Sequence, residues 1–314
     1  MFGVDYLPAY ELCRSPRIIV AFDLDFLRNL QEFRRSLKQS EDNKLTILLQ
    51  LGWSVFEPKY LSELSEKMNE ARRIFPDARI VLLANDEASM APLKAVGECL
   101  LCSQNAFLDP RRYPLFNAKR RKFDAIYIAR ITPFKRHSLA ANVQSLHLVG
   151  SHSRREEEYY RTVIAALSHA RYDDNIKSYL IPWHISLASC GLALSALEGA
   201  MFACGEYSLC GRPVVNTANK GGRDILLPEF SVYHANDTPE SVAEGVEYWK
   251  ENAPPPREIR DAFLKLAKVH RDRLEDFVAS IAGKRIPLPH KLGVRCHLLP
   301  HQKLLHGIRA KNKK

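Results

Sequence analysis

Short apolar runs alternate with segments of helical periodicity along most of the chain. In the first third we expect strands over residues 17–22, 45–50, 79–84 and 98–102, separated by helices over 24–37, 58–74 and 87–96. The helix over 58–74 is the most clearly marked, because apolar residues follow a three-to-four spacing at Leu61, Leu64, Met68, Ala71 and Ile74. Strands that alternate with helices predict a parallel sheet with crossover helices.

A second alternation follows a segment, residues 103–122, that is rich in Asn, Pro, Asp and Arg. It predicts strands over 123–129, 145–150, 190–195, 213–216 and 231–234, with helices over 136–142, 155–171, 201–210, 239–251 and 256–282. We therefore expect an α/β protein with two doubly wound, Rossmann-like parallel-sheet domains that face a cleft. The expected parts are an N-terminal domain over 1–104, a linker over 105–122, a C-terminal domain over 123–283 and a tail over 284–314.

The charge of the chain is concentrated at its C-terminal end. The 314 residues carry a net charge of +10, and residues 284–314 contain nine Lys and Arg without any Asp or Glu. A nearly neutral body with a basic tail indicates a contact with an anionic surface such as a membrane. The alternative is a solvated terminus. Because the sequence contains no helix-turn-helix and no basic surface interleaved with aromatic residues, we do not expect a nucleic-acid partner.

The cysteines and the apolar runs indicate where in the cell the protein is expected. Seven cysteines, without a secretory signal, indicate reduced thiols and a cytoplasmic protein. No apolar run is long enough for a membrane span, so we expect at most peripheral association with the cytoplasmic face of a membrane. Cys99 and Cys102 form a single C-x2-C pair, which favours two thiols on a buried strand over a zinc site.

The first chemical motif follows the strand predicted over 123–129. Arg130 and Lys135 flank a tight loop that leads into a helix. The planar fork of an arginine, the point charge of a lysine and the free N–H groups of a helix end together suit a diphosphate. The alternative is a surface loop that happens to carry basic residues.

Two further motifs follow later strands of the same predicted domain. Glu198 and Gly199 come just after the strand over 190–195, and Glu206 lies in the next helix, which Gly211 is expected to end. The pair Gly221-Gly222 follows the strand over 213–216, where glycine would let the backbone approach a ligand closely.

The order and spacing of these motifs resemble the nucleotide-sugar-binding domain of retaining glycosyltransferases with the GT-B fold, especially glycosyltransferase family 4. That family has an Arg and a Lys after the first strand of this domain, a Glu-x7-Glu block that runs into a "CG-PVV-T" segment, and a Gly-Gly loop. Residues 103–114 also resemble its inter-domain segment, so the resemblance covers roughly residues 103–285. Ala200-Met201 replaces the common Phe-Gly, and the short N-terminal part lacks the glycine-rich loop and a histidine.

The resemblance implies a role for each motif. Arg130 and Lys135 would hold the diphosphate and stabilise the leaving group, and Glu206 would bind the ribose hydroxyls. Glu198 would orient the donor sugar together with the backbone of three residues, which are Gly199, Ala200 and Met201. Gly221 and Gly222 would lie near the phosphates or the donor sugar.

The implied activity is the transfer of a hexose-type sugar from a nucleoside diphosphate to a glycan or lipid-linked acceptor, as in polysaccharide biosynthesis. The anomeric configuration would be retained, and neither a metal nor another cofactor would be required. Asp86, after the strand over 79–84, is the candidate for acceptor contact, while His137, His152 and His184 are expected to be surface or loop histidines. The alternative is a non-catalytic protein of GT-B descent that binds sugar nucleotides or glycans, which the short N-terminal part favours.

Overall fold

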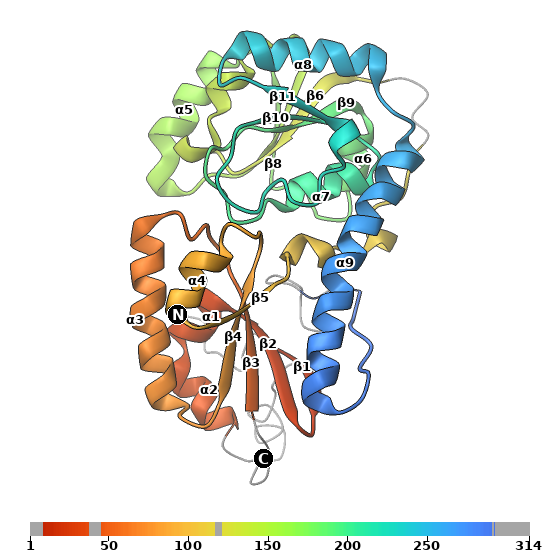
Figure 1. Ribbon diagram of the computed structural model, residues 1–314. Helices are drawn as coiled ribbons and strands as arrows, with labels where there is room; N and C mark the ends of the chain where they lie inside the picture. Colours follow the sequence, from red (N-terminus) through yellow and green to blue (C-terminus); the bar gives the residue numbers. More distant parts are fainter. Residues whose placement is uncertain (1–8, 38–44, 117–120, 291, 293–314) are drawn as a thin grey trace, which may run out of the picture. The chain divides into compact units, whose positions relative to one another are not determined.

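The computed structural model describes residues 9–37, 45–116, 121–290 and 292, which form two compact units (Figure 1). The first unit comprises Met1–Leu108 together with Lys268–Lys314, and the second comprises Asp109–Ala267. Among the described residues, no helix is both long and apolar enough to cross a membrane.

The first unit is built on a five-stranded sheet whose strands follow one another in chain order, β1-β2-β3-β4-β5. The strands are β1 (Ala9–Arg14), β2 (Arg17–Phe22), β3 (Leu45–Gln50), β4 (Arg79–Ala84) and β5 (Glu98–Leu101). The strands β2 to β5 are parallel, as predicted. The edge strand β1 was missed by the sequence pattern, and it pairs with β2 in the antiparallel direction.

Four helices connect the parallel strands of this sheet: α1 (Asp23–Arg28), α2 (Leu30–Leu37), α3 (Pro58–Ile74) and α4 (Met90–Val96). The single helix expected over 24–37 is divided at Asn29, whose side-chain amide donates to the carbonyl of Asp25 at 2.7 Å. Because each right-handed crossover steps in the same direction, the helices lie on one face. This sheet therefore lacks the reversal of strand order that the sequence analysis expected in both domains.

The opposite face of the first sheet is covered by the C-terminal part of α9 (Pro256–Ala282), drawn in blue in Figure 1. Nδ1 of His270 accepts a hydrogen bond from the Ser103 amide at 3.1 Å, and the Arg273 guanidinium donates to the Leu101 carbonyl at 3.1 Å. These contacts place the helix from Lys268 onward in the first unit. The sequence analysis assigned residues 123–283 to one domain, since the amphipathic pattern of α9 continues without a break.

The second unit contains a six-stranded parallel sheet of order β11-β10-β9-β6-β7-β8. Its strands are β6 (Phe123–Ile128), β7 (Leu146–Gly150), β8 (Arg171–Asp174), β9 (Ala188–Ala193), β10 (Val214–Thr217) and β11 (Val232–Ala235). Counted from β6, this is the 3-2-1-4-5-6 order of the Rossmann fold, and the order reverses between β6 and β9. The prediction of a doubly wound sheet is confirmed here.

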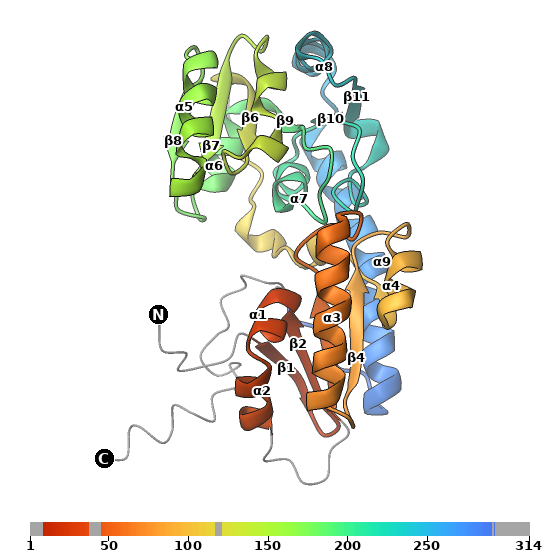
Figure 2. The ribbon, with the colours of Figure 1, turned by 90° about the vertical axis from the view of Figure 1, so that its left-hand side faces the viewer.

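The helices of the second unit are α5 (Glu157–Ala166), α6 (Ile181–Ser186), α7 (Phe202–Leu209), α8 (Pro239–Asn252) and the start of α9. Figure 2 shows α5 beside β8 at one end of the sheet and α8 beside β11 at the other. In place of the helix expected over 136–142 the structure has the 3-10 turn η4 (His137–Ala140), which follows the 3-10 turn η3 (Pro133–Lys135). The sequence analysis missed α6 and β8. The strand β8 was missed because its residues, Arg171–Asp174, are polar and show no apolar alternation.

A buried carboxyl group in the first unit makes its stability depend on pH. Asp23 directly follows β2, accepts a hydrogen bond from the Gly52 amide at 3.0 Å and a second from the Tyr60 hydroxyl, and has its pKa raised by burial to about 6. Because the folded state then binds a proton more tightly than the unfolded state, the free energy of unfolding decreases as pH rises from about 4 to 7.

We predict that this contribution amounts to about 3 kcal/mol, obtained from the rise in the Asp23 pKa from 3.8 to about 6. The Asp23→Asn variant does not titrate at this position. The difference in unfolding free energy between wild type and variant should therefore change by about 2–2.5 kcal/mol of this total between pH 4 and pH 7, as measured by urea denaturation. A difference that is constant over this range would contradict the prediction.

Candidate functional site

Three predicted motifs lie in loops that follow the carboxyl ends of β6, β9 and β10. Lys135 ends the 3-10 turn after β6, Glu198 lies in the loop after β9, and Gly221 lies in the loop after β10. Since β6 and β9 are the two strands between which the order reverses, their loops border the position where ligands bind in open α/β sheets.

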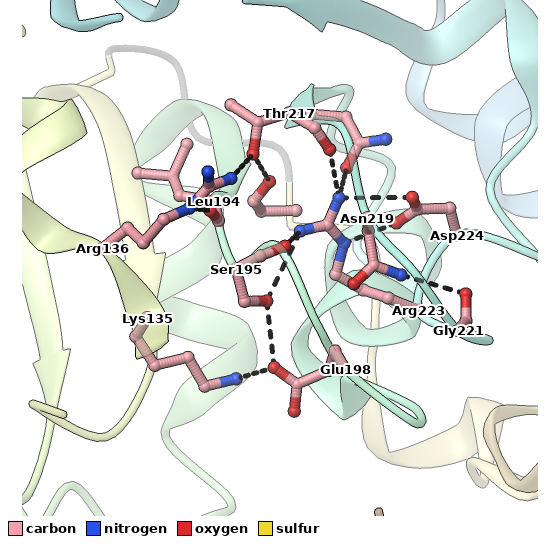
Figure 3. Close-up of polar contacts among 12 residues, drawn as sticks. Lys135, Arg136, Leu194, Ser195, Glu198, Thr217, Asn219, Gly221, Arg223 and Asp224 are labelled. Atoms are coloured by element: carbon pink, nitrogen blue, oxygen red, sulfur yellow. Dashed lines mark hydrogen bonds and ion pairs between the residues drawn. The ribbon is translucent and has the colours of Figure 1, made fainter. Parts of the chain in front are cut away.

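Lys135 and Glu198 form a direct ion pair, in which the lysine ammonium donates to Oε2 of the carboxylate (Figure 3). Both side chains are more than nine-tenths buried, at 8 % and 9 % exposure. The Ser195 hydroxyl donates to the same carboxylate oxygen at 2.9 Å. The backbone of Lys135 is held as well, because its carbonyl accepts a hydrogen bond from the buried Tyr127 of β6 at 2.5 Å. The two charges are thus fixed in place by the sheet.

Arg136 ties the loop after β6 to the neighbouring strands. Its backbone is left-handed, with φ of 52°, an uncommon conformation for a residue other than glycine. The guanidinium donates to the carbonyl of Leu194 at 2.5 Å and to the hydroxyl of Thr217 at 2.8 Å, and it pairs with Asp237 at 2.8 Å. This residue positions the loop, a role that the sequence analysis did not assign to it.

Arg223 is the central buried group of the loop after β10 (Figure 3). Its guanidinium donates to the Ser195 and Thr217 carbonyls, to Oδ1 of Asn216 at 2.7 Å and to Asp224 at 2.6 Å. It therefore fixes the preceding Gly221-Gly222 segment against the ends of β9 and β10.

The backbone of the Gly221-Gly222 segment adopts an uncommon conformation. Gly221 has φ of +116°, a conformation that residues with a side chain rarely adopt. Next to it, the amide of Glu198 donates to the carbonyl of Lys220 at 3.2 Å, and Leu197 and Lys220 form a parallel bridge. The loop that carries Glu198 and the loop that carries the glycines thus support each other.

The residues between Glu198 and α7 lead into an open helix end. Gly199 is buried, Ala200 is half-buried and the buried Met201 occupies the position before the helix, where no side chain caps the first turn. The free N–H groups of such a turn favour an anion. At the other end the helix stops as predicted, because Gly211 adopts φ of +66° just past its last turn.

Glu206 has a partner that the sequence analysis did not identify. Its Oε1 accepts a hydrogen bond from the Tyr113 hydroxyl at 2.8 Å, and the carbonyl of Tyr113 is in turn held by Arg260. Burial raises the pKa of Glu206, while the bond from Tyr113 lowers it, and the pKa lies above its ordinary value. Glu206, inside α7, and Glu198, in the loop before α7, are therefore held by different partners.

Arg130 differs from Lys135 in being exposed. Burial raises the pKa of the nearby Glu156, but hydrogen bonds from Ser153 and the charge of Arg130 together bring it below its ordinary value. Of the two cations predicted to bind the diphosphate, Lys135 is thus fixed and Arg130 is exposed to solvent.

Two residues considered in the sequence analysis, Asp86 and His137, are buried. Asp86, in the first unit, is buried and accepts hydrogen bonds from the Ser89 amide at 2.9 Å and the Ser89 hydroxyl at 2.6 Å, which stabilise the turn before α4. His137 was expected to be a surface or loop histidine. It lies in the loop after β6 but is fully buried, and burial together with the charge of Lys135 lowers its pKa to about 3. It is therefore a neutral core residue beside the site.

Comparisons with known proteins agree at the level of fold. No family model and no curated protein sequence matches the chain. The structure of Anabaena HepE in complex with UDP matches with a TM-score of 0.57 and 14 % identity, covering 84 % of this chain and 76 % of that one. AviGT4, a glycosyltransferase involved in avilamycin A biosynthesis, matches with a TM-score of 0.54 and 16 % identity, covering 82 % and 79 %.

Sucrose-phosphate synthase from Thermosynechococcus elongatus matches with a TM-score of 0.51 and 15 % identity, covering 84 % of this chain and 71 % of that one. The chain therefore has an α/β fold of the GT-B class, which confirms the predicted fold class.

Proposed function

We propose that this chain is a glycosyltransferase that moves a hexose-type sugar from a nucleoside diphosphate donor to a glycan or lipid-linked acceptor. The observation that carries the proposal is the buried Lys135–Glu198 pair at the reversal point of the second sheet. The exposed Arg130 on the same loop and the uncapped start of α7 supply further groups that suit a phosphate. The GT-B fold supports the same reading, and HepE was solved with UDP and with UDP-glucose.

In the proposed reaction, Arg130 and Lys135 bind the diphosphate and oppose the negative charge that grows on it as the donor sugar departs. A cation fixed before the reaction stabilises such a charge without reorganisation. Lys135 is held by Tyr127 and Glu198, which gives it this preorganisation. In this scheme the two side chains supply the positive charge that a divalent cation could otherwise bring, so that transfer is metal-independent and no cofactor takes part.

Glu198 would accept hydrogen bonds from the donor sugar and orient its anomeric carbon toward the acceptor. The bond from this carbon to the phosphate oxygen breaks, and the acceptor hydroxyl oxygen bonds to the same face. The hydroxyl proton passes to the departing phosphate oxygen. The configuration is then retained without a covalent intermediate, and positioning together with charge stabilisation supplies the catalysis.

The remaining predicted residues would bind the rest of the donor. Glu206 has one carboxylate oxygen fixed by Tyr113 and would accept hydrogen bonds from the ribose hydroxyls. Gly221 and Gly222 would bring their backbone close to the phosphates, with Arg223 holding the loop in shape. Asp86 would act at the acceptor only if it leaves its turn with Ser89.

We also propose a cytoplasmic location with peripheral attachment to an anionic membrane surface, where a lipid-linked acceptor would lie. The basic tail that prompted this proposal falls mostly outside the described residues. Support comes from the second unit, where exposed Phe116 and Trp183 make an edge-to-face contact at 5.6 Å, and where exposed Arg112 and Lys122 lie four and six residues from Phe116 in the sequence. Aromatic and cationic side chains together suit the interface of an anionic bilayer.

A non-catalytic protein that binds sugar nucleotides is the second candidate. The observation that favours it is the ion pair itself, since Lys135 and Glu198 are buried and neutralise each other. Such a protein would bind the donor without releasing nucleoside diphosphate.

We predict that one of UDP, GDP, CDP and ADP raises the thermal midpoint of the full chain. At a ligand concentration of about 100 times Kd, binding stabilises the folded state by about 2.7 kcal/mol, which corresponds to about 5–10 °C for a domain of this size. The Glu206→Ala variant should lose this shift, while Glu251→Ala, an exposed position on α8, should retain it. The absence of a shift with every nucleotide in the wild type would contradict a donor site.

A further inference from the structure

A second cluster of polar side chains lies in the second unit, away from the proposed donor site. His147 is the second residue of β7, Asp173 lies on the edge strand β8, and His184 lies on α6. His147 pairs with Arg171 in the register of the two strands, so Asp173, two residues further on, projects from the same face. The donor-site loops follow the carboxyl ends of other strands. The cluster is therefore independent of the proposed function.

The potential metal ligands of this cluster are close together and incompletely paired. One ligand atom from each of the three residues lies within 4.8 Å of the others, and Nε2 of His147 lies 2.8 Å from Oδ2 of Asp173. The His147 side chain is only 1 % exposed, and its Nδ1 is buried without a hydrogen-bond partner, as is Nδ1 of His184. A buried polar atom without a partner costs about 1–3 kcal/mol, so the unpartnered Nδ1 of His184 favours a ligand beside Asp173. In His147 the nitrogen that meets Asp173 is Nε2, and this is the nitrogen that would bind the same ligand.

We propose that His147, Asp173 and His184 bind a divalent transition-metal ion such as Zn²⁺. Two imidazoles and one carboxylate are the donor set that such ions prefer. Tetrahedral bonds of about 2.0–2.2 Å would bring the ligand atoms to about 3.3 Å from one another. Nε2 of His147 and Oδ2 of Asp173, now 2.8 Å apart, would have to separate by about 0.5 Å. The ligand atoms that lie up to 4.8 Å apart would have to approach by up to about 1.5 Å, which a rotation of the half-buried His184 side chain can supply. Water would occupy the fourth position.

Arg171 is the group that competes with the ion. Its guanidinium donates to Oδ2 of Asp173 at 2.7 Å and to Oδ1 at 3.1 Å, and its side chain is about half exposed. It must release at least one carboxylate oxygen when the ion binds, and its charge repels the ion. Removal of Arg171 should therefore strengthen metal binding. A purely structural hydrogen-bond network predicts only a loss of stability in the same variant.

We expect the bound ion to stabilise the fold rather than to take part in catalysis. The strand β8 has four residues and only β7 as a neighbour. An ion shared by β7, β8 and α6 would fasten this edge of the sheet, and it would raise the thermal midpoint of the chain without taking part in sugar transfer.

The test is a titration of the metal-free full chain with Co²⁺, followed by its visible d–d absorption, and with Zn²⁺ by calorimetry. We expect one ion per chain, a spectrum without thiolate charge transfer, binding at least about 10-fold weaker in His184→Ala, and tighter binding in Arg171→Ala. The control His234→Ala removes an exposed histidine paired with Glu229 and should bind as wild type does. Equal binding by wild type and His184→Ala, or weaker binding by Arg171→Ala, would overturn the proposal.

Discussion

Replacement of Lys135 by alanine is expected to reduce the rate of sugar transfer by about 10²–10³-fold, the usual cost of removing one preorganised group that opposes a developing negative charge. Lys135 is the fixed cation of the site, buried against Glu198, whereas Arg130 is exposed. The measurement is the initial rate of nucleoside diphosphate release at saturating donor. The control is Lys268→Ala, which removes a lysine from an exposed pair with Asp272 and should leave the rate unchanged.

The Lys135→Ala variant also leaves the Glu198 carboxylate buried without its cation, and a broken buried pair of this kind destabilises by about 3–5 kcal/mol. The double variant Lys135→Met/Glu198→Gln removes both charges and separates the two effects. Stability should recover toward that of wild type, because no buried charge is left unpaired, while transfer should remain as slow as in the single variant. Recovery of activity together with stability would show that Lys135 acts only in folding.

Replacement of Arg223 by alanine is expected to destabilise the second unit by about 3–5 kcal/mol, the range for breaking a buried charged network. The guanidinium is fully buried, and its loss would leave the Ser195 and Thr217 carbonyls and the Asp224 carboxylate without their shared donor. The change in unfolding free energy can be measured by urea denaturation. Nucleotide affinity should fall as well, because the Gly221-Gly222 segment loses its support.

A matched control for Arg223 is available on the surface of the same unit. Arg161 is largely exposed and pairs with Glu157 one helical turn away at 3.0 Å. Its replacement by alanine should cost no more than about 0.5 kcal/mol. A similar small effect at Arg223 would mean that the network does not hold the loop.

The sequence predicts the sheets of the two units better than their connections. Periodicity identified nearly all the buried parallel strands, because burial on both faces leaves a continuous apolar run. It could not identify the polar edge strand β8, where a strand of four residues, Arg-Tyr-Asp-Asp, has no apolar side to reveal it. The return of α9 to the first unit was also hidden, since His270 and Arg273 bind backbone groups that only the fold brings near.

At the candidate site, the sequence analysis identified residues by two features: a side chain that suits a phosphate or a sugar, and a position just after a strand. Lys135 and Glu198 were predicted to share a site, and the structure places them in contact. Arg223 was missed as a residue of the site, because an arginine after two glycines does not reveal that its side chain turns inward. Tyr113 was also missed as the partner of Glu206, since the two residues are 93 positions apart in the chain.

The most direct test of the proposed activity is the release of nucleoside diphosphate when the full chain is incubated with UDP-, GDP-, CDP- and ADP-sugars. The account predicts that the chain turns over one of these donor classes, by transfer to an acceptor or slowly to water, and that Lys135→Ala and Glu198→Gln each reduce the release by at least about 100-fold. Binding of a donor without any release by the wild type would favour the non-catalytic alternative. Release that persists undiminished in both variants would contradict the assignment of the site.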